Sequence, residues 1–156
     1  MDIALAQARA AAERGEVPVG AVVTTINGTP LAQAGNEVEA RADAAAHAEL
    51  LALRAAAVIR GEPRLTDCDL YVTLEPCPMC AQAISFFRIR RVVFGAYDPK
   101  GGGVEHGTRV FEAPSCRHRP EVIGGVRESE AAALLRAFFS AVRVVGTGFT
   151  PDTENP

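Results

Sequence analysis

The segment Thr73-Leu-Glu-Pro-Cys-Pro-Met-Cys80, together with His47-Ala-Glu49 upstream, decides how this chain must fold. Cys77 and Cys80 are spaced so that both sulfurs can reach one metal ion at the start of a helix. His47 can supply a third ligand from a second helix. Three nitrogen and sulfur ligands leave one position of a tetrahedral zinc ion open, and an open position is typical of a catalytic site.

Glu49 lies two residues beyond His47, close enough to reach the open position without binding the metal. The pattern H-x-E…P-C-x-x-C is the signature of the zinc-dependent nucleobase deaminases. This chemistry needs water to attack a ring carbon, and zinc lowers the pKa of a bound water from about 15.7 to about 7. We expect one zinc ion per chain, held by His47, Cys77 and Cys80. Glu49 would then carry the proton from the water to the ring nitrogen and the leaving amine.

The expected elements place these residues at one edge of a sheet. A strand over 70–74 followed by a helix puts the cysteines at the carboxyl ends of the strands, where open α/β sheets bind ligands. The positive ends of helices stabilise thiolates, so we expect the pKa values of Cys77 and Cys80 to be lowered.

Other interpretations of these residues exist. A C-x-x-C pair can be a thioredoxin-like redox motif, but redox chemistry has no need of His47 and Glu49. Glu75 is a second carboxylate beside the cysteines, and we expect it to orient the loop rather than to act as the acid. A closed structural zinc site would need a fourth protein ligand. Its conceivable donors, none with the spacing of a known closed site, are His106, His118, Cys68 and Cys116.

Length and composition favour one compact domain. The chain has 156 residues, of which 48% are hydrophobic and 22% charged, with a net charge of −3. These values are close to the average for soluble globular proteins. We expect a single deaminase domain over residues 1–145 and a flexible tail over 146–156. No apolar run approaches the roughly 20 residues that span a bilayer, and the N-terminus lacks a secretory signal. We therefore expect a cytoplasmic protein with no membrane contact.

Residue patterns predict alternating strands and helices. Asn27-Gly28 is a strong hairpin signal, and the alternation favours an α/β fold. We expect a three-layer α/β/α sandwich with one mixed five-stranded sheet, the hairpin first and helices on both faces. The expected helices cover 2–14, 46–60, 128–142 and a segment opened by Pro76 or Pro78 that runs to about Phe87. The expected strands cover 17–26, 31–35, 69–74, 91–96 and 121–124. Residues 36–45 are expected to form a loop, and 98–103 a flexible loop.

With these residues placed, the chain resembles the bacterial tRNA-specific adenosine deaminases of the cytidine-deaminase superfamily. The similarity runs from about residue 2 to residue 143, and its motifs are specific to this group. The zinc triad alone would mark only the superfamily. The motifs are Glu16-Val-Pro-Val-Gly-Ala21, Asn36, His47-Ala-Glu49, Leu70-Tyr-Val-Thr-Leu-Glu-Pro-Cys-Pro-Met-Cys80, Arg91-Val-Val-Phe-Gly-Ala96, Asp98 and the helix with Phe138-Phe139.

The resemblance implies a cytidine-deaminase-like fold and a homodimer. It implies that zinc-activated water attacks C6 of the wobble adenosine, in the anticodon loop of an arginine tRNA, to give inosine. By the same resemblance, Asn36 binds the flipped base, Val19 and the Ala48 backbone lie in the pocket with Leu74 close by, and Asp98 contacts the flanking nucleotide. Asparagine suits purine recognition because it offers a donor and an acceptor in one plane. It is also a common turn residue after a hairpin, and the sequence leaves both roles open.

Three departures from the family pattern bear on RNA binding, and none touches the zinc ligands or Glu49. Asp43-Ala44-Ala45-Ala46 lacks the proline usual before the zinc histidine. Glu37 follows Asn36 where the family commonly has arginine, and Arg117 stands where asparagine or histidine is frequent. All but one of the 16 basic residues are arginines, a weak sign of phosphate binding. Candidate phosphate contacts are Arg88, Arg90, Arg91, Arg117 and Arg119.

Two other functions stay open. A free-nucleobase deaminase for guanine or cytosine would use the same zinc chemistry, and the net negative charge slightly favours a small substrate. A non-catalytic, zinc-binding partner subunit would keep the metal but would not need Glu49. The segments 17–21 and 73–77 favour the RNA enzyme.

Overall fold

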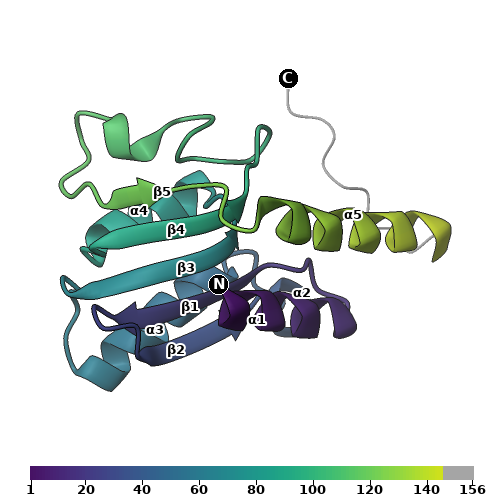
Figure 1. The fold of residues 1–156 in the computed structure, drawn as a ribbon, viewed down its shortest axis with the longest axis horizontal. Coiled ribbons are helices and arrows are strands. Elements are labelled where there is room, and N and C mark those ends of the chain that lie inside the picture. The colour runs from purple at the N-terminus through teal and green to yellow at the C-terminus, as the bar shows by residue number, and fades with distance from the viewer. Residues whose placement is uncertain (146–156) are drawn as a thin grey trace.

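The computed structural model describes residues 1–145 of the chain. Within this range the strands form one mixed sheet in the order β2-β1-β3-β4-β5 (Figure 1). β1 runs antiparallel to β2 and β3, whereas β3, β4 and β5 are parallel. The strand bounds are β1 Gly20–Thr25, β2 Pro30–Gly35, β3 Cys68–Leu74, β4 Arg91–Ala96 and β5 Glu121–Ile123.

Helices cover both faces of this sheet. α1 and α5 lie on the face toward the viewer in Figure 1, and α3 and α4 lie behind it. The prediction of a three-layer α/β/α sandwich with a mixed five-stranded sheet is therefore confirmed for the described residues. The helix bounds are α1 Asp2–Glu13, α2 Val38–Arg41, α3 Ala48–Arg60, α4 Pro78–Phe86, α5 Glu128–Val145 and the 3-10 turn η1 Val110–Glu112.

The first hairpin forms where Asn27-Gly28 predicts it. Gly28 has φ +85° and donates its backbone N–H to the Thr25 carbonyl oxygen at 2.9 Å. This left-handed conformation favours glycine. The preceding strand begins at Gly20 and not at Val17, because the Val19 N–H bonds the Val17 carbonyl in a local turn and not a neighbouring strand.

Helix α1 lies directly against β1 because Gly20 has no side chain. A Cβ atom at Gly20 would overlap the Ala4 carbonyl oxygen and lie 2.5 Å from the Ala8 nitrogen. The buried face of α1 is made largely of alanine, with Leu5 as its large member. Small residues on both sides allow this close approach and pin the N-terminal helix to the hairpin.

Strands β3 and β4 form the buried centre of the sheet. Leu70, Val72, Val92 and Phe94 are each 0% exposed, as expected for parallel strands that are covered on both faces. Ion pairs hold the amino ends of these strands. Arg90 binds both oxygens of the buried Asp69 at 2.9 and 2.6 Å. The functional site lies at the opposite edge of the sheet, at the carboxyl ends of these strands.

The prediction of a loop over 36–45 is wrong in part, because Val38–Arg41 forms the short helix α2. The buried Glu16 carboxylate accepts the backbone N–H groups of Glu39 and Ala40 at 3.2 and 2.8 Å. These two donors would otherwise be unsatisfied at a helix start. The acceptor comes from 23 residues earlier in the chain, so the local sequence does not predict this helix.

The remaining helices and strands match their expected ranges to within a few residues at each end. None of the helices within residues 1–145 is long and apolar enough to cross a membrane. The predicted tail over 146–156 lies outside the described residues.

Candidate active site

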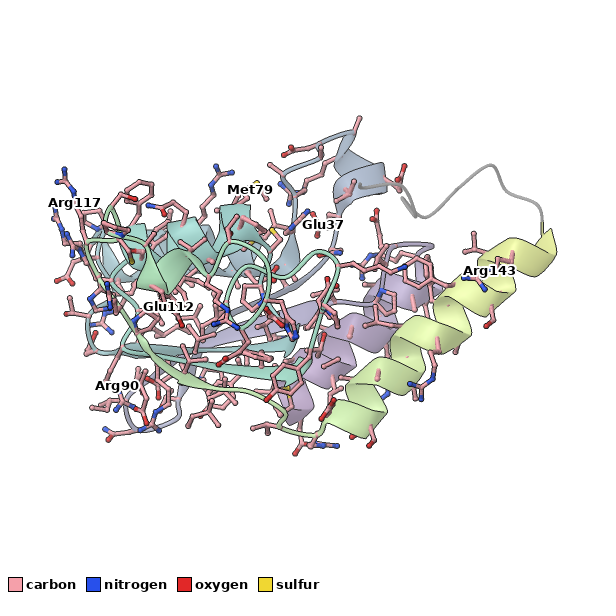
Figure 2. The ribbon with its side chains drawn as sticks, turned by 90° about the horizontal axis from the view of Figure 1, so that it is seen from above. Glu37, Met79, Arg90, Glu112, Arg117 and Arg143 are labelled. Carbon is pink, nitrogen blue, oxygen red and sulfur yellow. The ribbon has the colours of Figure 1, made fainter. Side chains whose placement is uncertain are left out.

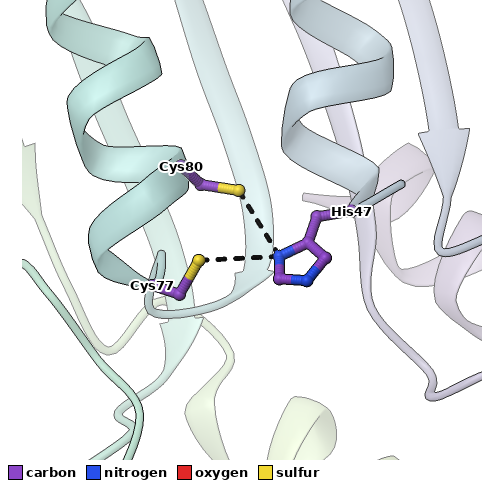
Figure 3. Close-up of side chains that lie close together, drawn as sticks. All are labelled: His47, Cys77 and Cys80. Carbon is purple, nitrogen blue, oxygen red and sulfur yellow. Dashed lines mark hydrogen bonds between the residues drawn. The ribbon is translucent and has the colours of Figure 1, made fainter. Parts of the chain in front are cut away.

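Three side chains predicted to bind metal converge between α3 and α4 (Figure 3). His47 Nδ1 lies 3.5 Å from the sulfur of Cys77 and 3.5 Å from that of Cys80. All three ligand atoms lie within 4.8 Å of one another. Among the described residues, no other group of three His, Cys, Asp or Glu side chains meets this criterion.

Each of these residues stands at or next to the start of a helix. His47 is the N-cap of α3, and Cys77 is the N-cap of α4, with Pro78 in the first turn. Cys80 follows one turn later on the same helix. Proline is favoured at this position because its missing N–H has no partner there anyway. The C-x-x-C spacing therefore sets both sulfurs on one side of the first turn of α4.

The pKa of Cys77 is lowered to about 4 by the hydrogen bond from Cys80 and, after the opposing effect of burial, by that from His47. The prediction of a lowered pKa is wrong for Cys80, because its hydrogen bond to Cys77 and its burial both raise the pKa of this thiol. The pKa of His47 is raised, mainly by its hydrogen bond with Cys77. A metal ion can displace the proton that the Cys77 thiolate and the His47 imidazole share, because both groups bind metal in their deprotonated forms. The donor set, two sulfurs and one nitrogen, fits zinc and leaves one tetrahedral position free.

The other cysteines and histidines have partners elsewhere. His106 Nδ1 bonds Glu75 at 2.8 Å, and His118 Nε2 bonds the Ile89 carbonyl at 2.6 Å. The Cys116 sulfur donates to the His118 carbonyl at 3.1 Å. Cys68, 0% exposed, lies beside Arg60 and Asp67. None of the four joins the cluster, so a fourth protein ligand is absent among the described residues.

Glu49 lies beside the cluster and is 4% exposed. Burial raises its pKa to about 7, because a carboxylate without water is costly to keep charged. The Cys80 sulfur lies 3.7 Å from Glu49 Oε2. A carboxyl group that gains and loses a proton near neutral pH is suited to general acid–base catalysis.

A cavity of about 860 Å³ opens over this group. His47, Glu49 and Cys77 lie in its wall, as do Val19, Leu74 and Asp98, three of the residues implied by resemblance. No lysine or arginine is among its lining residues. The cavity therefore suits an uncharged ring better than a phosphate group.

Asn36 lines the cavity, and its side-chain oxygen already has one partner. Its Oδ1 accepts the Ala48 backbone N–H at 2.8 Å, which orients the amide and leaves its NH₂ group and the second lone pair of the oxygen to meet a base. The same bond occupies the Ala48 backbone donor. The Ala48 residue is fully buried and is not among the lining residues.

The loop over 98–103, which the sequence predicts to be flexible, is joined to the turn before α4 by hydrogen bonds. Glu75, 1% exposed, accepts backbone N–H groups from Asp98, Val104, Glu105 and His106 at 3.0–3.3 Å. Burial raises the pKa of Glu75, but the bonds from His106 and the backbone amides outweigh it and hold the pKa below its usual range. These contacts agree with the expectation that Glu75 orients the loop.

Asp98 occupies the start of this loop. Its Oδ1 accepts the backbone N–H groups of Lys100 and Gly101 at 3.2 and 2.9 Å. This oxygen therefore closes a turn, and contact with a substrate would fall to Oδ2.

The candidate phosphate-binding arginines lie away from the cavity and are partly engaged. Arg90 and Arg91 pair with Asp69 and Glu121. Arg88 donates to the Arg117 carbonyl at 3.1 Å. In Figure 2, Arg90 and Arg117 lie at the end of the molecule away from Glu37.

Glu37, a departure from the family pattern, pairs with Arg41 one turn along the chain. Its negative charge is therefore balanced locally.

Several lining residues were not predicted to lie at the site, although Glu16 and Phe138 stand in motifs that carry the family resemblance. Glu16 and Glu39 come from distant elements, and Phe138 and Val142 come from the far half of α5. The helical pattern of α5 could place its apolar face toward the domain, but it could not show that the helix extends over the cavity.

Comparison with known proteins agrees with this geometry. Residues 1–96 match the cytidine and deoxycytidylate deaminase zinc-binding region. A tRNA-specific adenosine deaminase from Agrobacterium fabrum is 52% identical over 144 residues, which cover 92% of this chain and 94% of the relative. The chain belongs to the tRNA-specific adenosine deaminase family of zinc-binding deaminases.

Solved structures of related deaminases have the same fold as this chain. A structure from work on A-to-I editing by tRNA:A34 deaminases has a TM-score of 0.84 at 52% identity, and the match covers 86% of this chain and 97% of that chain. Guanine deaminase from Bacillus subtilis has a TM-score of 0.62 at 28% identity, with 98% and 94% covered. The deaminase chain is thus similar both to a tRNA deaminase and to a guanine deaminase.

Proposed function

We propose that this deaminase hydrolyses the wobble adenosine of a tRNA, in the anticodon loop, to inosine. The observation that carries the proposal is the buried Glu49 beside a His47–Cys77–Cys80 cluster in the wall of an open cavity. The 52% identity to a tRNA-specific adenosine deaminase supports tRNA as the substrate. An arginine tRNA is the proposed substrate, and one Zn²⁺ per chain the proposed cofactor.

His47, Cys77 and Cys80 would hold the ion through Nδ1 and two thiolates. When bound, zinc supplies the Lewis acidity that lowers the pKa of water to about 7. Glu49 would take one proton from the water at its carboxylate and pass it to the ring nitrogen. It would then take the second proton, from the hydroxyl added to C6, and give it to the leaving amine. Its pKa of about 7 places both protonation states within reach at neutral pH.

Recognition of the base falls to the cavity walls. The Asn36 amide NH₂ is a donor held in place by the bond between its oxygen and the Ala48 N–H. Val19 and Leu74 supply apolar contact with the ring, and Asp98 the contact with a flanking nucleotide. Because no cationic side chain lines the cavity, phosphates would stay outside while a flipped base enters.

A guanine deaminase activity is the second candidate. The 28% identity to Bacillus subtilis guanine deaminase supports it, and so does the cavity, which accepts an uncharged ring. A non-catalytic partner subunit finds no support, since Glu49 keeps the position that the chemistry requires.

A homodimer in the cytoplasm, with residues 1–145 as its single domain, completes the proposal. α3 and α4, which share one face of the sheet, expose Val58, Ile59 and Phe86 by 81%, 60% and 67%. Apolar groups so exposed on neighbouring helices support a protein interface there.

The test uses zinc-loaded protein, an anticodon stem-loop with adenosine at the wobble position, and sequencing of inosine. Glu49→Gln keeps the size of the side chain and removes its proton transfer, so we expect activity to fall roughly 10²–10⁴-fold with zinc retained. Glu62→Gln, on the exposed surface, is the control. Ammonia release from free guanine without inosine would favour the second candidate. Full activity of Glu49→Gln would refute the proposed role.

A further inference from the structure

Glu75 is a buried carboxylate that the proposed chemistry does not use. Its side chain is 0% exposed, and it lies two residues before Cys77. All described hydrogen bonds of its carboxylate come from residues 98–106: four backbone N–H groups and the His106 ring. Burying a charged carboxylate costs free energy unless hydrogen bonds compensate it. Five donors from one segment supply that compensation here.

We propose that Glu75 is a positioning residue, which fastens the segment Asp98–His106 to the turn that carries Cys77 and so fixes one wall of the substrate cavity. The proposal depends on the proposed function only for the identity of the substrate. The fastening itself is a property of the described contacts.

The loop packs so closely around the Glu75 carboxylate that it can adopt only one arrangement there. A Cβ atom on Gly102 would overlap Glu75 Oε2, so this glycine allows the loop to close over the carboxylate. The Gly103 N–H donates to the Pro76 carbonyl at 2.8 Å, a second link to the same turn. These glycines allow the loop to approach Glu75 and Pro76 closely, and this is their role here rather than mobility.

Only an anionic acceptor suits this site. Glu75 Oε2 alone receives three backbone N–H groups, from Val104, Glu105 and His106. A glutamine would offer one acceptor oxygen and would turn its NH₂ group toward other donors. The isosteric change Glu75→Gln therefore breaks the network without altering its volume.

The position of Asp98 follows from this network. Glu75 Oε1 holds the Asp98 N–H at 3.1 Å, and the Asp98 side chain in turn closes the turn to Gly101. Both Asp98 and Gly101 line the cavity. Loss of the Glu75 carboxylate should therefore loosen the selection of substrate more than the chemical step.

The test compares wild type, Glu75→Gln, His106→Gln and the surface control Glu62→Gln as zinc-loaded proteins. Hydrogen exchange is measured at residues 98–106, with zinc content, KM and kcat on stem-loops whose nucleotides next to the target adenosine differ. We expect exchange at 98–106 to rise at least about tenfold in Glu75→Gln, the factor that corresponds to one lost hydrogen bond to a charged group. His106→Gln, which replaces the ring N–H by an amide NH₂ on a more flexible side chain, should give a smaller rise, and the control none.

We also expect zinc to remain bound, KM to rise more than kcat falls, and discrimination between flanking nucleotides to narrow. Unchanged exchange at 98–106 in Glu75→Gln would overturn the proposal, as would loss of zinc with the loop still protected. If Glu75→Gln does not fold, His106→Gln decides by the same readouts. If wild type makes no inosine, the proposed function fails, while the exchange result still decides the role of Glu75.

Discussion

Replacing Gly103 by alanine adds one methyl group where the loop lies against the metal-binding turn. The new Cβ would lie 2.6 Å from the Pro78 nitrogen, 2.7 Å from the Pro78 Cα and 2.9 Å from the Cys77 carbonyl carbon. All three atoms are backbone, so none can move aside as a flexible side chain would. Either the loop lifts, or the turn that carries Cys77 shifts.

Gly101 offers a matched control two residues away. A Cβ there meets only the Asp98 side chain, with the nearest oxygen at 3.0 Å. That carboxylate can rotate. We expect Gly103→Ala to cost about 1–3 kcal/mol, as for overpacking of a close-packed interior, and Gly101→Ala to cost roughly 0.5 kcal/mol or less, as for ordinary surface changes.

Thermal unfolding of the zinc-loaded proteins measures this difference. Each kcal/mol lowers Tm by about 2–4 °C in a chain of this size, so Gly103→Ala should melt roughly 2–12 °C below wild type. We also expect its zinc to leave faster to a chelator, because Cys77 is displaced. If the two alanine variants share one Tm and release zinc at equal rates, the loop does not press on the metal turn.

Three further predictions follow from the described contacts. Cys80→Ser should lose bound zinc, whereas Cys116→Ser should keep about one ion per chain; equal zinc content, measured by mass spectrometry, would contradict the assigned ligands. Arg90→Ala leaves a buried carboxylate without its cation and should cost about 1.5–3 kcal/mol in urea unfolding, against less than about 1 kcal/mol for Arg91→Ala, whose pair is more exposed. Glu130→Gln should lower Tm at pH 7, and the Tm difference should shrink as the pH falls below 4.5, because Arg127, just before α5, and Arg9 on α1 hold the pKa of Glu130 below its usual value of 4.5. That stabilisation is present above pH 4.5 and is lost as the pH falls through the lower folded pKa; a Tm difference that does not shrink on acidification would refute it.

The metal cluster was predictable because its information is local. The C-x-x-C spacing and Pro78 fix two sulfurs on one helical turn, and the His47–Glu49 spacing fixes the other pair of groups at the start of α3. The hairpin at Asn27-Gly28 is local in the same sense. Each of these patterns predicts structure from the geometry of a single turn of the chain.

The sequence did not reveal contacts whose partner is distant in the chain. The three glycines in residues 98–103 predict a flexible loop, yet Glu75, which accepts the Asp98 N–H, lies more than 20 residues upstream. α2 is short and has no cap of its own, and Glu16 supplies its acceptor from the turn after α1. Composition within a loop does not reveal an acceptor that reaches it from elsewhere.

Asn36 shows the same division within one side chain. Its residue type predicted a donor and an acceptor for a purine, and both groups are present. The fold uses one lone pair of the oxygen to accept the Ala48 N–H, and this bond sets how the amide is oriented in the cavity wall.

The sequence by itself predicted the chemistry proposed for this protein: the proposed ligands, the proposed acid–base glutamate and most of the strands and helices, because each depends on residue type and on spacing within one or two turns. Only the tertiary structure decided the shape and charge of the cavity. Its walls come from α2, the loop after β4 and the far half of α5, which meet at the carboxyl ends of β3 and β4. The positions of α2 and of the loop after β4 are set by two buried glutamates, whose hydrogen-bond donors lie 23 to 31 residues away along the chain.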